Sequence, residues 1–338
     1  VMIGTGGTFT NLASMVSHRR MRSVASDLLP LNVRGCEVQH SEVRHLVEDL
    51  RKLTPWQRAR FPGLSTDRAD IIVAGLTIVD RLLRYLNVNR LVTHDQGIRT
   101  GCLVSMIRAH CPSSSAGVDA VDRMASVRRF ATSCRSDPDH GEHVARLALR
   151  IHEQAREWFI PDDPTWTTDE ARDWLEAAAL LHDVGFYINF SSYHKHSYHL
   201  IMHSDLAGFS SREIELIANI ARYHRKGRPK RSHTNYGRLS KRDRRVVKRL
   251  AAILRIAVGL DRTRHQQVTD VRLQRRDGLF RLDAEAADDP AVNLWGAERK
   301  SGLFERVFDC ELRLTWMGSA AALPAARAET GPEAVRDG

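Results

Sequence analysis

Two segments near the middle of the chain carry imidazole and carboxylate groups of the kind that bind metal ions in proteins. His140 lies in the first segment, and the adjacent His182 and Asp183 follow an apolar stretch in the second. A run rich in histidine comes next, at residues 193–199. Divalent transition metals favour these ligands, and a metal held in this way can activate water against a phosphoester. The pattern therefore predicts phosphate chemistry.

A histidine, then a His-Asp pair on a second helix, then further histidines resembles the layout of an HD-type phosphohydrolase helical domain. Such a site needs a fourth ligand, an aspartate on a later helix, and the matching position here is Val258. Valine cannot bind a metal, and Asp261 could replace it only if the helix were shifted. We therefore interpret His140, His182 and Asp183 as a hydrogen-bonded structural remnant, and an independent metal phosphohydrolase is the alternative.

Positive charge is concentrated in one segment of the chain. Thirteen lysines and arginines and a single acid, Asp243, fall between Arg222 and Arg249, while the whole chain carries a formal net charge of +10. A local field of this sign concentrates polyanions such as inorganic polyphosphate, a highly phosphorylated nucleotide or nucleic acid. Nucleic acid is the least favoured, because no aromatic-interleaved motif accompanies the charge. A solvated basic loop is the alternative. The candidate polyphosphate-binding track is Arg222, Arg225, Lys226, Arg228, Lys230 and Arg231.

A glycine-rich loop near the start of the chain could bind phosphate. It follows a strand over residues 1–3 and precedes a helix, so its backbone N–H groups could approach an anion. An ordinary glycine turn is the alternative. A second loop, at residues 95–101, also lies between a strand and a helix, and we interpret Asp95 there as a helix N-cap rather than a metal ligand. The candidate phosphate- or nucleotide-binding residues are Gly4, Thr5, Gly6, Gly7 and Thr8.

The periodicity of the chain divides it into regions. Strands alternate with helices over residues 1–111, which predicts an α/β lobe; a helix rich in apolar residues over 68–86 should be buried on more than one side. Residues 112–124 are a linker and 125–264 are helical throughout. A small α/β domain is expected over 265–318, with a hairpin turn at Asp277-Gly278 and a strand over 307–314. Residues 319–338 are expected to be a disordered tail.

The two loops, together with Pro62-Gly63-Leu64 and the segment 68–75, resemble the second actin-like (ribonuclease H-like) lobe of the Ppx/GppA family of exopolyphosphatases and guanosine pentaphosphate phosphohydrolases. The HD-type helical region and the segment 295–308 resemble the later domains of that family, so the resemblance covers about residues 1–318. It implies a fold of a partial actin-like α/β lobe, an HD-type helical domain and a small β-containing domain.

The resemblance also implies an activity that uses Mg²⁺: release of the terminal phosphate from polyphosphate, or of the 5′ phosphate from guanosine pentaphosphate (pppGpp). A homodimer is compatible with it. In this family two phosphate-binding loops and a catalytic glutamate precede the point at which this chain begins. We therefore expect no catalytic residue in this chain, which would be the C-terminal portion of an N-terminally truncated enzyme. A catalytically silent module that binds polyphosphate or an alarmone is the alternative.

The composition indicates the class of the protein and its location in the cell. The chain has 338 residues, of which 42% are hydrophobic and 27% charged, as in an ordinary globular protein. No run approaches the roughly 20 apolar residues that span a bilayer, and no signal peptide is recognisable. The five cysteines are scattered, as expected for reduced thiols. These features predict a cytoplasmic protein with no membrane partner.

Overall fold

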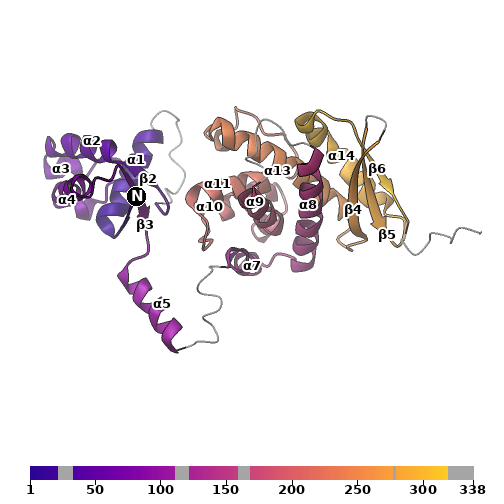
Figure 1. Ribbon diagram of the computed structural model, residues 1–338, viewed down its shortest axis with the longest axis horizontal. Helices are drawn as coiled ribbons and strands as arrows, with labels where there is room; N and C mark the ends of the chain where they lie inside the picture. The colour runs from indigo at the N-terminus through magenta and orange to yellow at the C-terminus, as the bar shows by residue number, and fades with distance from the viewer. Residues whose placement is uncertain (22–32, 111–121, 159–167, 277–278, 319–338) are drawn as a thin grey trace, which may run out of the picture.

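The computed structural model describes residues 1–21, 33–110, 122–158, 168–276 and 279–318. In sequence order they form an α/β lobe, a helical region and a small sheet with one long helix, which Figure 1 shows one after another along the long axis. The predicted tail at 319–338, the predicted turn at Asp277-Gly278 and nearly all of the predicted linker at 112–124 lie outside the described residues. No helix in the described ranges is long and apolar enough to cross a membrane.

The first lobe is built on a three-stranded sheet in the order β1-β3-β2. Strand β1 runs parallel to β3, with Thr5 opposite His94, and β2 runs antiparallel to β3. Parallel pairing brings the carboxyl ends of β1 and β3 to the same edge, and the two loops singled out from the sequence begin there. The elements of this lobe are β1 (Met2–Thr5), α1 (Gly7–Met21), β2 (Glu37–Gln39), α2 (His40–Arg51), α3 (Pro55–Arg58), the 3₁₀ turn η1 (Thr66–Arg68), α4 (Ile72–Tyr85), β3 (Arg90–His94) and α5 (Ile98–His110).

The helix expected over residues 68–86 is shorter, and its surroundings differ from the prediction. The turn η1 comes first and α4 begins only at Ile72, which places Leu76 and Leu83 in the core of the lobe. Burial on more than one side was wrong, because Ile78 is 61% exposed and Tyr85 is 86% exposed. Helix α4 buries one face against α1 and α2, and its opposite apolar face lies open among the described residues.

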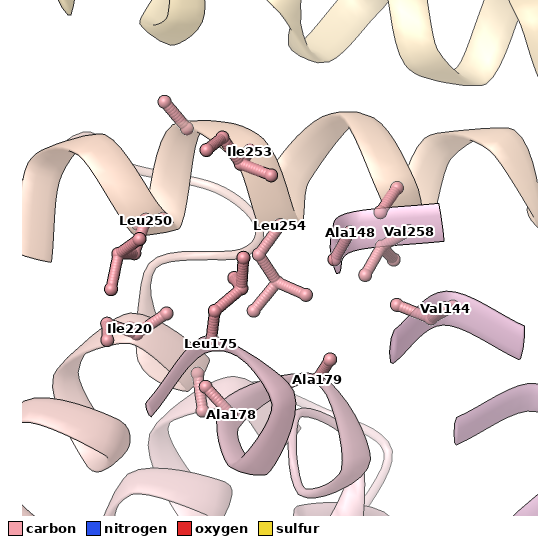
Figure 2. Packing of buried hydrophobic residues seen from close by; sticks show 14 of the residues in the cluster. Val144, Ala148, Leu175, Ala178, Ala179, Ile220, Leu250, Ile253, Leu254 and Val258 are labelled. Carbon is pink, nitrogen blue, oxygen red and sulfur yellow. The ribbon is translucent and has the colours of Figure 1, made fainter. Parts of the chain in front are cut away.

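The helical region has its core between α8, α9, α11 and α13. Figure 2 shows Leu250 and Leu254 of α13 facing Leu175 of α9 and Ile220 of α11, with Val258 further along α13. From Leu250 to Leu260 every residue of α13 is buried, so this helix is the central element of the region. Its elements are α7 (Arg123–Ser133), α8 (Pro138–Trp158), α9 (Asp169–Leu180), the 3₁₀ turn η3 (Val184–Tyr187), α10 (Tyr193–Met202), α11 (Ser211–Arg222), α12 (Thr234–Gly237) and α13 (Lys241–Leu260).

A second three-stranded sheet, in the order β4-β5-β6, completes the described chain. Strands β4 (Val268–Arg276) and β5 (Leu279–Ala286) are antiparallel, as the hairpin prediction requires, and β6 (Leu312–Trp316) is parallel to β5. The strand expected over 307–314 begins later, because α14 (Ala291–Phe308) continues through Phe308 and ends where Asp309 turns left-handed at φ 50°.

Helix α14 packs unusually closely on α13. A Cβ placed at Gly259 would lie 2.4 Å from Cα of Ala297, and one at Gly296 would lie 2.8 Å from the Gly259 carbonyl oxygen. Only glycine permits backbones to approach this closely. The contact sets the position of α14 beside the carboxyl end of α13, where the candidate site lies.

Candidate functional site

The structure brings together the three residues that the sequence analysis singled out as candidate metal ligands and interpreted as a structural remnant. His140 lies in the first turn of α8, and His182 and Asp183 follow the end of α9, which packs against α8. One potential ligand atom from each residue lies within 4.8 Å of the others, and all three residues are buried. The His140 and His182 rings are 5.1 Å apart between centroids.

Asp261 joins this cluster in a way that the sequence did not predict. Its Oδ2 lies 2.7 Å from Nδ1 of His140, and the residue is fully buried. Asp261 reaches His140 without a shift of the helix, because α13 ends at Leu260 and Asp261 leaves the helical conformation, with φ −119° and ψ 42°. The backbone N–H of Gln266 donates to its other carboxylate oxygen at 2.9 Å. Val258 remains on the helix, borders the site and offers no ligand atom, as predicted.

Both histidines have the hydrogen bonding that metal-binding imidazoles usually show. Nδ1 of His140 bonds to Asp261, and Nδ1 of His182 bonds to the carbonyl oxygen of Ala179 at 2.7 Å. Nε2 of His182 is buried without a hydrogen-bond partner. Burial lowers the pKa of His182 to about 4, so this imidazole is neutral at physiological pH, as a ligand must be. The histidines therefore fit a metal ion.

Asp183, the third potential ligand, already has cationic and hydroxyl partners. Arg264 Nη2 lies 2.9 Å from Oδ2, and the Ser136 hydroxyl donates to Oδ1 at 2.7 Å. Burial opposes ionisation of Asp183, but His182, Ser136 and Arg264 outweigh it and lower the pKa. If a divalent ion bound Nε2 of the two histidines and this carboxylate, it would supply an activated water. The ion would have to share Asp183 with a guanidinium.

A cavity of ≈ 680 Å³ opens beside the two histidines, and basic side chains dominate its walls. Among the described residues, Asp261, already paired with His140, is the one carboxylate that lines it. The aromatic rings of Phe186, Phe190, Tyr193 and Trp295 form much of the remaining wall. The basic residues that line it are Arg225, Lys226, Arg262, Arg264, Arg299 and Lys300.

The basic segment is held in place by one buried guanidinium. Arg255 of α13 donates to the carbonyl oxygens of Tyr223, Lys226 and Gly227, at 2.7, 2.8 and 2.8 Å. Burial, and then the neighbouring Arg228, lower the pKa of Arg255 to about 10, so it stays charged at neutral pH. These bonds fix the loop although Lys226 has the left-handed φ of 55°.

The residues of the predicted track divide between two cavities. Arg225 and Lys226 line the cavity beside the histidines. Arg228 and Lys230 line a neighbouring cavity of ≈ 640 Å³, to which α13 adds Arg245, Lys248 and Arg249. Arg222 lies over the Tyr198 ring at 5.2 Å, and Arg231 is exposed outside the residues that line either cavity.

The glycine loop lies where the sequence placed it, at the end of β1 and the beginning of α1. Gly6 has a φ of 104°, which only glycine adopts readily, and the Arg68 guanidinium lies against Gly7. The Thr5 hydroxyl donates to the carbonyl oxygen of Gln96, which joins the two predicted loops. None of the residues 4–8 lines the cavity beside the histidines.

Asp95 has a different role from the predicted helix N-cap. Its carboxylate accepts two hydrogen bonds from Arg34, from Nε at 2.8 Å and Nη2 at 3.1 Å. The remaining nitrogen of Arg34 donates to Asp205 of the helical region at 2.7 Å. The N-cap interpretation was wrong because an arginine distant in sequence provides a stronger, charge-assisted partner.

Sequence reasoning missed four of the six cations around the first cavity. Arg262 and Arg264 follow α13, while Arg299 and Lys300 lie on α14, all beyond the basic segment. Charge density along the chain could not identify them, because glutamates and apolar residues surround them in sequence. Only the close packing of α13 on α14 brings them to the site.

Comparisons with known proteins agree on one family. The model of the Ppx/GppA phosphatase family matches residues 2–110, and the model of Ppx/GppA phosphatase domain III matches residues 123–286. Two curated relatives are named guanosine-5'-triphosphate,3'-diphosphate pyrophosphatase. The one from Pseudoalteromonas translucida is 28% identical over 67% of this chain and 42% of its own length; the one from Vibrio vulnificus is 25% identical over 75% and 46%. The chain thus spans less than half the length of these relatives.

Solved structures with local similarity come from Aquifex aeolicus. The crystal structure of its Ppx/GppA family member is 25% identical, covers 32% of this chain and 34% of that chain, and has a TM-score of 0.28. The type II variant of the same phosphatase is 26% identical, covers 30% and 33%, and has a TM-score of 0.27.

Proposed function

Because the chain belongs to the Ppx/GppA phosphatase family, we propose that it binds the condensed-phosphate substrate of a phosphatase that releases terminal phosphate from polyphosphate or pppGpp. The two relatives described above are named for the hydrolysis of guanosine-5'-triphosphate,3'-diphosphate, which supports guanosine pentaphosphate as the substrate. The observation that carries the proposal is the position of the basic loop, residues 223–231. Arg255 anchors this loop through its backbone, and the cations of the loop line two adjacent cavities.

The loop suits a long anion for electrostatic reasons. Arg225 and Lys226 meet one cavity, while Arg228 and Lys230 meet the next, so one polyanion could contact both in succession. Each phosphate unit of a polyphosphate chain carries negative charge, and each contact of a phosphate with lysine or arginine releases counterions. The glycine loop of residues 4–8, with Arg68 beside it, would contribute a second phosphate or nucleotide contact in an actin-like lobe. We assign no catalytic residue within this chain.

The test compares polyphosphate affinity over a series of salt concentrations. We expect the wild-type chain to bind more weakly as salt rises. In a variant with Arg225, Lys226, Arg228, Lys230 and Arg231 changed to Gln, the slope of log affinity against log salt should fall by about one for each phosphate that the loop no longer neutralises. A matched control removes five positive charges distant from both cavities (R19Q, R51Q, R60Q, R81Q and R90Q). Equal affinity and slope in the loop variant and the wild-type chain would contradict the proposal.

A second candidate function is that of an independent metal phosphohydrolase, favoured by the hydrogen bonding of the two histidines. Nε2 of His182 is buried and unpartnered beside His140 and Asp183. If this function is correct, purified protein will contain one divalent transition metal per chain and release phosphate from polyphosphate or pppGpp, and His182→Ala will lose both. Metal-free protein that binds polyphosphate without releasing phosphate would instead identify a silent binding module.

A further inference from the structure

The first lobe and the helical region have separate hydrophobic cores. Buried apolar residues between positions 12 and 91 form one cluster, and those between 127 and 314 form the other. Figure 1 shows the lobe beside the helical region, with α10 and α11 nearest to it, but no helix or strand described in the lobe packs broadly on either helix. Two bodies that share no core can change their relative position without unfolding.

One arginine joins the two bodies. The Arg34 guanidinium donates twice to Asp95 within the lobe, at 2.8 and 3.1 Å, and once to Asp205 of the helical region, at 2.7 Å. The Ser211 hydroxyl, at the start of α11, donates to the carbonyl oxygen of Arg34 at 2.6 Å. Asp205 and Ser211 therefore both reach the lobe at the same residue, one through its side chain and the other through its backbone.

The lobe holds Arg34 in a fixed position. The next residue, Gly35, donates its N–H to the carbonyl oxygen of Thr93 in β3 at 2.8 Å, which bonds the turn to the sheet. Gly35 has a φ of 70°, which glycine adopts without strain. The Arg34 side chain is only 15% exposed. Its bidentate pairing with Asp95 fixes the plane of the guanidinium and leaves the third nitrogen for the helical region.

The contact on the helical side can be released easily. Asp205 lies between α10 and α11, and its side chain is 73% exposed. An ion pair with so exposed a partner contributes little free energy and is screened by salt. A Cβ placed at Gly35 would lie 3.2 Å from Cβ of Ser210, so the two backbones approach closely, but the groups that meet there are small or polar. The contact can therefore break without exposing a hydrophobic core to water.

We infer that Arg34 is an ion-pair latch that holds the first lobe against the helical region, and that the two bodies separate when the latch is released. The closed arrangement is favoured at low ionic strength. High ionic strength favours the open one, because salt screens the exposed pair of Arg34 with Asp205.

The latch lies between the two loops that the proposed function uses. Asp95 belongs to the loop that the Thr5 hydroxyl joins to the glycine loop, and Ser211 begins α11, after which the basic loop follows. Release of the latch therefore changes the distance between the glycine loop and the basic loop. The use of both loops by one ligand rests on the proposed function, whereas the latch does not.

The experiment measures the radius of gyration of the full 338-residue chain by small-angle X-ray scattering. The variant D205A/S211A removes both bonds from the helical region and leaves the pair of Arg34 with Asp95 in place. At about 0.05 M salt we expect it to have a radius of gyration larger than that of the wild-type chain by about 2 Å or more. As salt rises to about 1 M, the wild-type chain should expand by a similar amount and the variant should change little.

Two further variants separate the latch from general effects of charge. Asp49→Ala removes the same charge and breaks an ion pair with Arg19 inside the lobe, and it should match the wild-type chain at both salt concentrations. Asp205→Glu retains the carboxylate and should also match it. Thermal unfolding confirms that each variant is folded.

The inference is overturned if D205A/S211A has the wild-type radius of gyration at low salt, if Asp49→Ala expands the chain equally, or if the wild-type chain does not expand as salt rises. No ligand is present in this experiment, so failure of polyphosphate to bind the basic loop would leave its result unaffected.

Discussion

At the scale of single residues, the site differs from the four-ligand metal centre of an HD-type domain in the partners of its side chains. Val258 occupies the fourth position, Asp261 instead bonds to His140, and Arg264 pairs with Asp183. The sequence was sufficient to identify His140, His182 and Asp183, because adjacent residue types carried the pattern. It could not place Asp261, because nothing after Leu260 marks the helix end: the sequence has no glycine there.

Lys300 makes the proposed binding of condensed phosphate depend on pH. Its pKa is lowered to about 7 in the free protein by burial and by Arg255, Arg262 and Arg225, with His224 also nearby. It is therefore protonated below that pH and neutral above it, and a bound anion raises its pKa. We expect the wild-type chain to bind tripolyphosphate about tenfold more tightly than Lys300→Met at about pH 6, and this advantage to shrink toward about pH 9. Calorimetry on both proteins measures the ratio; a ratio close to one throughout this pH range would show that Lys300 does not contact the ligand.

At the scale of secondary-structure elements, pairing between distant segments decides where functional residues lie. Strand-helix alternation predicted the α/β lobe, and the hairpin β4-β5 was confirmed. The sequence did not predict that α4 leaves one apolar face exposed, because residues such as Ile78 and Tyr85 have the same residue types as buried ones. Nor could it show that Arg299 of α14 reaches a cavity bordered by α13, which is a long-range contact.

The loop anchored by Arg255 should lose order when the anchor is removed. Arg255→Met retains much of the aliphatic volume but leaves the carbonyl oxygens of Tyr223, Lys226 and Gly227 without their donor. We expect a loss of about 1–3 kcal/mol in the free energy of unfolding and faster amide hydrogen exchange over residues 223–228. Arg242→Met, at an exposed position in the first turn of the same helix, is the control. Unchanged exchange in Arg255→Met would show that the loop is ordered by other contacts.

The close approach of α13 and α14 gives a second prediction at this scale. Gly259→Ala would place a Cβ 2.4 Å from Cα of Ala297 and force the helices apart. We expect a destabilisation of about 1–3 kcal/mol in denaturant unfolding, and weaker tripolyphosphate binding because Arg299 and Lys300 move with α14. Gly101→Ala in α5, where nothing lies within 4 Å of an added Cβ, is the matched control. If Gly259→Ala is as stable as the wild-type chain, the two helices can separate without cost and their close packing does not position the site.

At the scale of the whole molecule, positive charge is gathered where the helical region meets α14. The basic loop, the turn after α13 and α14 converge on one cavity, and α13 joins the loop around the next. The condensed phosphate proposed as ligand would meet these cations at the two cavities.

The most direct test of the proposed condensed-phosphate binding is a crystal structure of the chain with tripolyphosphate bound, because it locates each phosphorus atom. We predict phosphate density in the cavity between Arg225, Arg262 and Lys300, within hydrogen-bond distance of at least two guanidinium groups. Density confined to the glycine loop of residues 4–8, or a well-formed crystal whose basic cavities contain only water, would contradict it.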